Sequence, residues 1–152
     1  ALVKMWARQS EFVEFSDSPW TDLTAPASQS RLALVTTAGV HHRSQTPFNM
    51  HDRAGDPTYR EIPSDVSVNN LVITHDYYDH TDADRDINIV LPIERVRELR
   101  DFGDIGEVNH RHFSFMGHIA GQHVKALIRD TAPGVASVVK ADGGEIVILT
   151  PA

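Results

Sequence analysis

The stretch from residue 31 to residue 40 reads RLALVTTAGV, which is typical of a buried β-strand. It is short, apolar and partly β-branched, and a glycine stands near its end. Three further apolar runs have the same character: LVIT at 71–74, INIVL at 87–91 and EIVIL at 145–149. Polar or helical segments separate these runs. The pattern therefore predicts strands that alternate with helices in an α/β fold.

Helical signals lie between the last two predicted strands. Pro92 suits the first turn of a helix, and Gly103 is a typical helix end. Between them, apolar residues recur at helical spacing: Ile93, Val96, Leu99 and Phe102. Two shorter helical stretches follow at 122–128 and 135–140, while 110–118 reads as a strand or a site-bearing loop. We expect an open, partly parallel sheet with flanking helices.

The length of 152 residues suits one domain, and 41% hydrophobic residues provide a core. We expect an N-terminal extension over residues 1–30 and a single α/β domain over residues 31–152, or the N-terminal part of a longer domain. The run at 145–149 is apolar without a break, which predicts a strand buried on both faces. The chain ends shortly after it, so the fold is expected to be incomplete at the C-terminus. Further residues, a second copy or another subunit would supply the missing cover.

Composition excludes several classes of function. The net charge of −7 and the lack of a basic stripe argue against nucleic-acid binding. No apolar run approaches the roughly 20 residues that span a bilayer, so no membrane partner is expected. Cysteine is absent, which leaves no disulfide and no thiol nucleophile within these residues and fits a reducing, cytoplasmic location.

The histidines predict where a polar site lies. All nine fall between His41 and His123. Polar segments directly follow predicted strands at 39–43, at 75–80 and at 150–151, and the carboxyl ends of parallel strands face one crevice. We therefore predict that His41 and His75 converge there, at the carboxyl ends of adjacent strands. The alternative is that each strand simply leaves the sheet into a polar loop.

The acidic segment 75–86 leaves a second alternative open. Its aspartates and histidines are ligands that a divalent metal accepts, which makes His41, His75 and Asp79 a candidate metal site. The register fails as a calcium loop, because a loop begun at Asp82 has isoleucine where glycine is required. The alternative is a solvated acidic loop in which Asp79 or Asp82 caps local turns. We also predict that Asp86 and Asn88 are more buried than Asp82 and Asp84.

Two further side chains are candidates for substrate binding. Arg60 lies in a turn-rich loop, where it either holds a substrate carboxylate bidentately or pairs internally with a neighbouring acid. Ser114 shares one face of a predicted strand with His110 and His112. It lacks the glycine-flanked motif of a hydrolase nucleophile, so we expect it to contact substrate and not to attack it.

Several phrases occur in an order that resembles the selenoprotein B family of glycine, sarcosine, betaine and D-proline reductases. The resemblance runs from about residue 31 to residue 151, and its most specific part is 55–116. The phrases are TTAGVHHRSQTPF, GDPTYREIP, THDYYDHTDADRDINIVLPIERVREL, GDIGEVNHRHFSFMGHI and EIVILTP.

The resemblance implies a reductase subunit that cleaves a carbon–nitrogen bond in a small amine or amino acid. It also implies attack by a selenocysteine or cysteine that follows the strand ending in Thr-Pro, and a partner subunit that carries a pyruvoyl group. No cysteine stands in this sequence, so the thiol or selenol would come from outside these residues. A noncatalytic subunit that keeps only the fold is the third alternative.

The residue types suggest roles within that chemistry. His41 and His75 are candidate donors of a proton to the leaving amine. Asp79 or Asp86 is a candidate to orient an imidazole or to hold a substrate ammonium, and Arg60 to hold the carboxylate. We expect a protein partner or a homo-oligomer. Intact mass and metal analysis would separate the alternatives.

Overall fold

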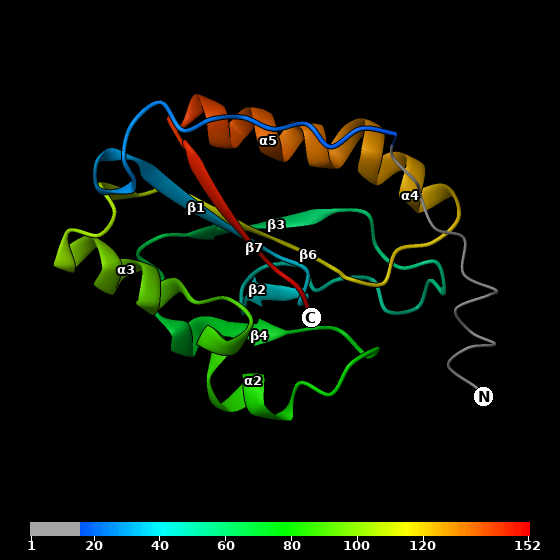
Figure 1. The fold of residues 1–152 in the computed structure, drawn as a ribbon. Helices are drawn as coiled ribbons and strands as arrows, with labels where there is room; N and C mark the ends of the chain where they lie inside the picture. Colours follow the sequence, from blue (N-terminus) through cyan, green and yellow to red (C-terminus); the bar gives the residue numbers. More distant parts are fainter. Residues whose placement is uncertain (1–15) are drawn as a thin grey trace, which may run out of the picture.

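The computed structural model describes residues 16–152, and its centre is a five-stranded sheet (Figure 1). In this sheet β1 pairs in parallel with β5 and then β6 along one side and with β7 along the other, while β3 runs antiparallel to β6. The open, partly parallel sheet is therefore confirmed. The strands are β1 (Arg31–Thr36), β3 (Tyr59–Pro63), β5 (Glu107–Val108), β6 (Arg111–Phe115) and β7 (Ile146–Thr150).

A second, two-stranded sheet lies beside the first. It pairs β2 (Val40–His42) with β4 (Leu71–Ile73) in antiparallel register. The run 31–40 is therefore not one strand, because β1 ends at Thr36 and the chain turns before β2. Gly39 makes that turn with φ +70°, and a Cβ there would meet the carbonyl oxygen of Thr74 at 2.5 Å. Only glycine fits this position.

The helices flank the main sheet. The helix predicted after Pro92 is confirmed as α3 (Ile93–Phe102), and Gly103 ends it in the left-handed conformation. The two stretches predicted at 122–128 and 135–140 belong to one helical run: α4 (Gln122–Ala126), a π turn (Leu127–Thr131) and α5 (Ala132–Ala141). Pro133 does not break this run: it stands at the start of α5, directly after the π turn, and the helical run continues through it.

The run INIVL at 87–91 was expected to be a strand, and this prediction is wrong. Short helix α2 (Thr81–Arg85) leads into a 3-10 turn over Ile87–Ile89. Two further 3-10 turns occupy Ala27–Gln29 and Val68–Asn70. Asp86 caps the turn at 87–89 by accepting a hydrogen bond from the Asn88 amide, and a capping carboxylate faces water. Asp86 is therefore as exposed as Asp82 and Asp84, and only Asn88 is partly buried as predicted.

Two apolar clusters hold the layers together, one on each face of the main sheet. The first joins the sheet to α3 and to the β2–β4 sheet, and includes Leu34, Val40, Ile62, Leu91 and Ile93. The second joins the other face to α5, and consists of Ala33, Phe113, Phe115, Val135 and Val139. Figure 1 shows α5 along one face, with α3 and the smaller sheet on the opposite side.

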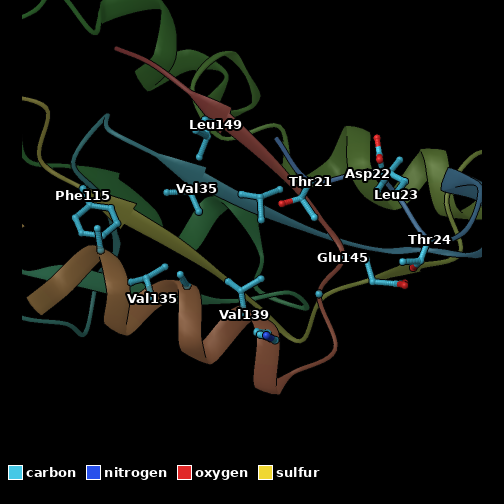
Figure 2. A pocket seen from close by; sticks show the side chains of 15 residues that line it. Thr21, Asp22, Leu23, Thr24, Val35, Phe115, Val135, Val139, Glu145 and Leu149 are labelled. Atoms are coloured by element: carbon cyan, nitrogen blue, oxygen red, sulfur yellow. The ribbon is translucent and has the colours of Figure 1, made fainter. Parts of the chain in front are cut away.

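The last strand is not buried on both faces, which corrects the sequence-based prediction. Among the described residues β7 pairs only with β1, and Val147 and Leu149 are 44% and 72% exposed. These two side chains lie along a groove of about 650 Å³ between α5 and the segment 21–24 (Figure 2). Helix α5 covers the neighbouring strands and leaves β7 open.

Candidate functional site

The ends of three parallel strands meet at one edge of the main sheet. Because β1, β6 and β7 run in parallel, the residues that follow them lie together: Thr37, Gly117 and Pro151–Ala152. Two hydrogen bonds tie this edge together. The Thr37 amide donates to the Thr150 carbonyl at 3.1 Å, and the Ala152 amide donates to the Thr37 hydroxyl oxygen at 3.2 Å. We call this region the carboxyl edge.

The smaller sheet delivers His75 to the carboxyl edge. The Thr74 amide bonds the Gly39 carbonyl at 3.0 Å, which fixes the chain just before His75. The His75 side chain is buried, and its Nδ1 accepts a hydrogen bond from the Tyr77 amide at 3.1 Å. Its other nitrogen, Nε2, has no partner. A Cβ on Gly117 would lie 3.2 Å from that nitrogen and 2.9 Å from the Thr37 carbonyl oxygen, so the missing side chain of Gly117 lets the chain after β6 pack closely against His75.

Aromatic rings enclose the His75 imidazole. Tyr77 and Tyr78 meet it edge-on, with ring centroids 5.9 Å and 4.9 Å away, and Tyr77 stacks on His118 at 3.9 Å. Burial lowers the pKa of His75, and the charge of His118 acts in the same direction. The imidazole is therefore neutral near pH 7. With Nδ1 accepting the amide, its single proton stands on Nε2.

Tyr78 borders His75 and is held in place by a hydrogen bond from its hydroxyl. Its hydroxyl donates to the Ala38 carbonyl at 3.1 Å, and burial raises its pKa to about 12, with the charge of Asp84 adding to the shift. The phenol therefore stays protonated at neutral pH. Tyr77 is 52% exposed and marks where the site meets solvent.

His41 is buried in the middle of β2, where both of its ring nitrogens have partners. Nε2 bonds the Thr74 hydroxyl at 2.8 Å and Nδ1 bonds the His42 carbonyl at 2.9 Å. The prediction that His41 and His75 both lie at strand carboxyl ends is wrong for His41. Since β2 and β4 are antiparallel, their carboxyl ends point in opposite directions. The two imidazoles have different neighbours and do not contact each other.

The structure does not bring the remaining candidate residues to the carboxyl edge. Asp79 is exposed and accepts two hydrogen bonds from Thr81, and Asp86 caps its own turn. Ser114 is fully buried inside β6, with a hydroxyl that has no partner. Within residues 16–152, no three His, Asp or Glu side chains are grouped so that they could hold a metal ion. His41, His75 and Asp79 are not such a group.

Arg60 is occupied by its own loop. Its guanidinium donates to the carbonyls of Thr46, Pro47 and Tyr59 and to the Thr58 hydroxyl, at 2.7–3.0 Å. It also lies 3.6 Å from a carboxylate oxygen of Asp56 and stacks over the Phe48 ring. Of the two roles considered for Arg60, internal pairing is the one for which the structure gives contacts.

Sequence reasoning missed the residues that surround His75. Thr37, Tyr77, Gly117 and His118 contact or border it, yet no sequence motif singles them out. The Gly117–His118 pair after the aromatic run at 113–115 was the one available signal, because a glycine at a strand end often lets another group approach closely.

Comparison with known proteins places the chain in a family. The glycine/sarcosine/betaine reductase selenoprotein B family matches residues 11–152. The chain belongs to this family. It is 38% identical over 144 residues to D-proline reductase subunit gamma of Acetoanaerobium sticklandii, an alignment that covers 93% of this chain. It is 27% identical over 132 residues, or 81% of this chain, to glycine reductase complex component B subunit gamma of Carboxydothermus hydrogenoformans.

The chain spans 57% of the first of these family members and 28% of the second. Both relatives are named as subunits of reductases. No solved structure was found to match the chain. Within the part of the family fold that the structure describes, no helix is long and apolar enough to cross a membrane.

Proposed function

We propose that this chain is part of an amino-acid or amine reductase that cleaves a carbon–nitrogen bond at the carboxyl edge. Family membership supports the reaction class, and the buried, unpartnered Nε2 of His75 supports the place. The nucleophile is a thiol or selenol from outside these residues, because the sequence has no cysteine. The partners in this proposal are a small amine or amino acid and further subunits, since both relatives are named as subunits. The proposal also includes a pyruvoyl group on one of the partner subunits.

The overall reaction balances with a dithiol as reductant. The carbon–nitrogen bond breaks, the carbon and the nitrogen each gain a hydrogen, and the dithiol becomes a disulfide. In this proposal His75 contacts the reacting molecule, Tyr78 and His118 exclude water around it, and His41 positions Thr74 and so the approach to His75. Asp79 and Asp86 remain candidates to hold a substrate ammonium only if the acidic loop moves, since both are now engaged in local turns.

The carboxyl edge is a suitable place for an external nucleophile. At the strand ends of β1 and β6, the Thr37 carbonyl and His75 both lie close to Gly117, which is exposed. In open α/β sheets, ligands bind beyond the carboxyl ends of the strands. A thiol or selenol carried on a segment that packs against this edge would lie close to His75.

Reconstitution tests the proposal. The chain is combined with the other subunits of a reductase complex and supplied with a dithiol and, in turn, glycine, sarcosine, betaine or D-proline. We expect dithiol-dependent release of the amine, or opening of the proline ring, with at least one substrate. His75→Phe should reduce the rate at least tenfold, whereas His110→Ala, at an exposed position outside the site, should not. A fully assembled complex that is inactive toward all four substrates would overturn the proposal.

A further inference from the structure

A cleft of about 650 Å³ opens between β4 and the chain that runs from α2 to the start of α3. In Figure 1, β4 lies between β2 and α2. Buried apolar side chains of the first cluster form the base of the cleft: Leu71, Ala83 and Ile87. The rest of the lining is largely polar and includes the carboxylates of Asp86 and Glu94. The cleft therefore combines an apolar base with an acidic wall.

The free edge of β4 forms one wall of the cleft. Among the described residues, β4 pairs only with β2, and all three of its residues line the cleft. The Thr74 amide donates to the Gly39 carbonyl at 3.0 Å, so Thr74 directs its main-chain groups toward the β2 side. Because this direction alternates from residue to residue, Ile73 directs its amide and its carbonyl to the opposite edge. That edge can pair with another extended segment.

The opposite wall carries two carboxylates that one side chain holds together. The side-chain nitrogen of Asn88 donates to Oδ1 of Asp86 at 2.9 Å and to Oε2 of Glu94 at 2.8 Å. The side-chain oxygen of Asn88 accepts the Glu94 main-chain amide at 3.0 Å, which fixes the Asn88 side chain. Hydrogen bonds from Asn88 lower the pKa of Asp86, so this carboxylate is ionised at neutral pH. Two negative charges therefore lie side by side.

The positive side chains near this wall do not neutralise the carboxylate pair by direct contact. The arginines are engaged with other groups: Arg85 with Asp82, Arg95 with Glu98, and Arg43 with the Asn69 carbonyl. Two neighbouring carboxylates attract a cation, and the planar fork of a guanidinium suits them in particular. The wall thus complements a basic side chain.

We propose that this cleft docks an extended, basic segment of a partner protein. The main chain of that segment adds to β4 by bonding the amide and the carbonyl of Ile73, and its basic side chain lies between Asp86 and Glu94. In strand addition of this kind, main-chain bonds supply affinity and side-chain sites supply specificity. The net charge of −7 also favours a basic partner. The docking surface goes beyond the proposed function and does not depend on it.

Peptide binding to the 152-residue chain tests the docking surface. The peptide is acetyl-TVRVT-amide, whose β-branched residues favour an extended chain and whose only charge is the arginine. Two matched peptides carry citrulline in place of arginine, or a methyl group on every main-chain amide nitrogen. We expect the first peptide to shift the NMR signals of the Ile73 and Glu94 amides saturably, and both matched peptides to bind at least tenfold more weakly.

Three results of this experiment would overturn the proposal. One is the absence of any saturable shift with acetyl-TVRVT-amide. Another is equal binding of either matched peptide, because the charge or the main-chain pairing would then be irrelevant. The third is an equally strong shift of the Ile73 amide with methylguanidinium alone, which would show a site for a small cation and not for a strand.

Charge-removing variants of the protein provide the second test. Asp86→Asn and Glu94→Gln keep an acceptor for Asn88, and asparagine caps a turn as well as aspartate does. We expect the double variant to bind acetyl-TVRVT-amide at least tenfold more weakly. Glu98→Gln, on the same helix but outside the cleft lining, is the matched control and should bind as the parent does. Unchanged binding in the folded double variant would overturn the proposal. Neither test measures reductase activity, so a failure here leaves the proposed function untouched.

Discussion

At the scale of single residues, one buried histidine joins β1 and β6 at a point where their main chains do not pair. β1 pairs with β5 at its start and with β6 at its end, and the Leu34 amide between these two pairings donates to Nδ1 of His112 at 3.0 Å. His112 is completely buried. Its side chain thus replaces a missing main-chain acceptor at the centre of the sheet.

This position predicts how stability depends on pH. Burial, aided by the charge of Arg97, lowers the pKa of His112 from 6.5 to about 4. The unfolded chain takes up this proton near pH 6.5, so the free energy of unfolding should fall as pH drops from 6.5 to 4, by about 3 kcal/mol. Denaturant titrations at several pH values measure this slope. His112→Asn keeps an acceptor but does not titrate, so the free energy of unfolding of this variant should depend less steeply on pH. The pH dependence that remains in the variant should come from His75, whose pKa is also lowered.

A second prediction concerns Gly55, where two chain segments touch. With φ +87°, a Cβ at this position would lie 1.7 Å from the His118 carbonyl oxygen, which is main chain and cannot move aside easily. We expect Gly55→Ala to lower the free energy of unfolding by 3 kcal/mol or more, on the order of a severe core change. Gly121→Ala also has a positive φ but no neighbour within 4 Å, so it should show only the cost of the backbone conformation, about 1–2 kcal/mol. Equal losses in the two variants would show that the contact with His118 is unimportant.

At the scale of elements, the long loop between β2 and β3 is held by side chains, because it has little regular structure. Arg60 binds the carbonyls of one part of it, and the Asp56 carboxylate accepts from the Asn49 and Thr58 amides. The other end is joined to the chain after β6 by the Asp52–His123 pair at 2.9 Å. Hydrogen bonding from His123 lowers the pKa of Asp52. The loop therefore packs against the segment that contains Gly117 and His118 and stabilises it.

Replacing Arg60 by lysine should make this loop more mobile, because it removes hydrogen bonds to the loop carbonyls. Lysine keeps the charge but cannot reproduce the planar set of donors that reaches several carbonyls at once. We expect trypsin to cut after the exposed Arg53 several-fold faster in Arg60→Lys, with a loss of about 1–3 kcal/mol in the free energy of unfolding. Arg95→Lys alters an exposed ion pair with Glu98 and should leave both quantities unchanged within error. Unaltered cleavage in Arg60→Lys would mean that other contacts hold the loop.

At the scale of the whole molecule, the sheet is covered unevenly. Its two apolar clusters fill the centre, but in the described part of the chain the outer strand β7 pairs only with β1, and Val147, Ile148 and Leu149 remain 44%, 36% and 72% exposed. Side chains of β7 alternate between the faces. Ile146 therefore packs against the first cluster, while Val147 and Leu149 line the groove beside α5 (Figure 2).

A lysine introduced on one face of β7 should change the free energy of unfolding much less than a lysine introduced on the other face. Leu149→Lys changes a largely exposed side chain, so the free energy of unfolding should stay within about 0.5 kcal/mol of the parent. Ile146→Lys places an ammonium against the core and should cost about 2 kcal/mol or more. Chemical denaturation of both variants gives the comparison, and binding of a hydrophobic dye should fall in Leu149→Lys. A large loss of stability in Leu149→Lys would contradict an open groove.

The sequence pattern predicted the structure correctly where neighbouring residues determine the backbone conformation. The helix between Pro92 and Gly103, the start of the strand at residue 31 and the class of the fold follow from apolar spacing and from helix-ending glycine, which are properties of neighbouring residues. The run at 87–91 failed because its apolar pattern suits a buried turn as well as a strand. Periodicity alone does not separate the two over five residues.

The sequence by itself determined the fold class, the family-like phrases and the concentration of histidines in the middle of the chain. Only the tertiary structure decided that His41 is internally bonded, that Arg60 is occupied by its loop and that the Nε2 of His75 is buried without a partner beside the carboxyl edge. The physical reason is that a side chain is available for chemistry only if its hydrogen bonds are not already made. Those partners come from segments far apart in the chain, such as Thr74 for His41, so no local pattern records them.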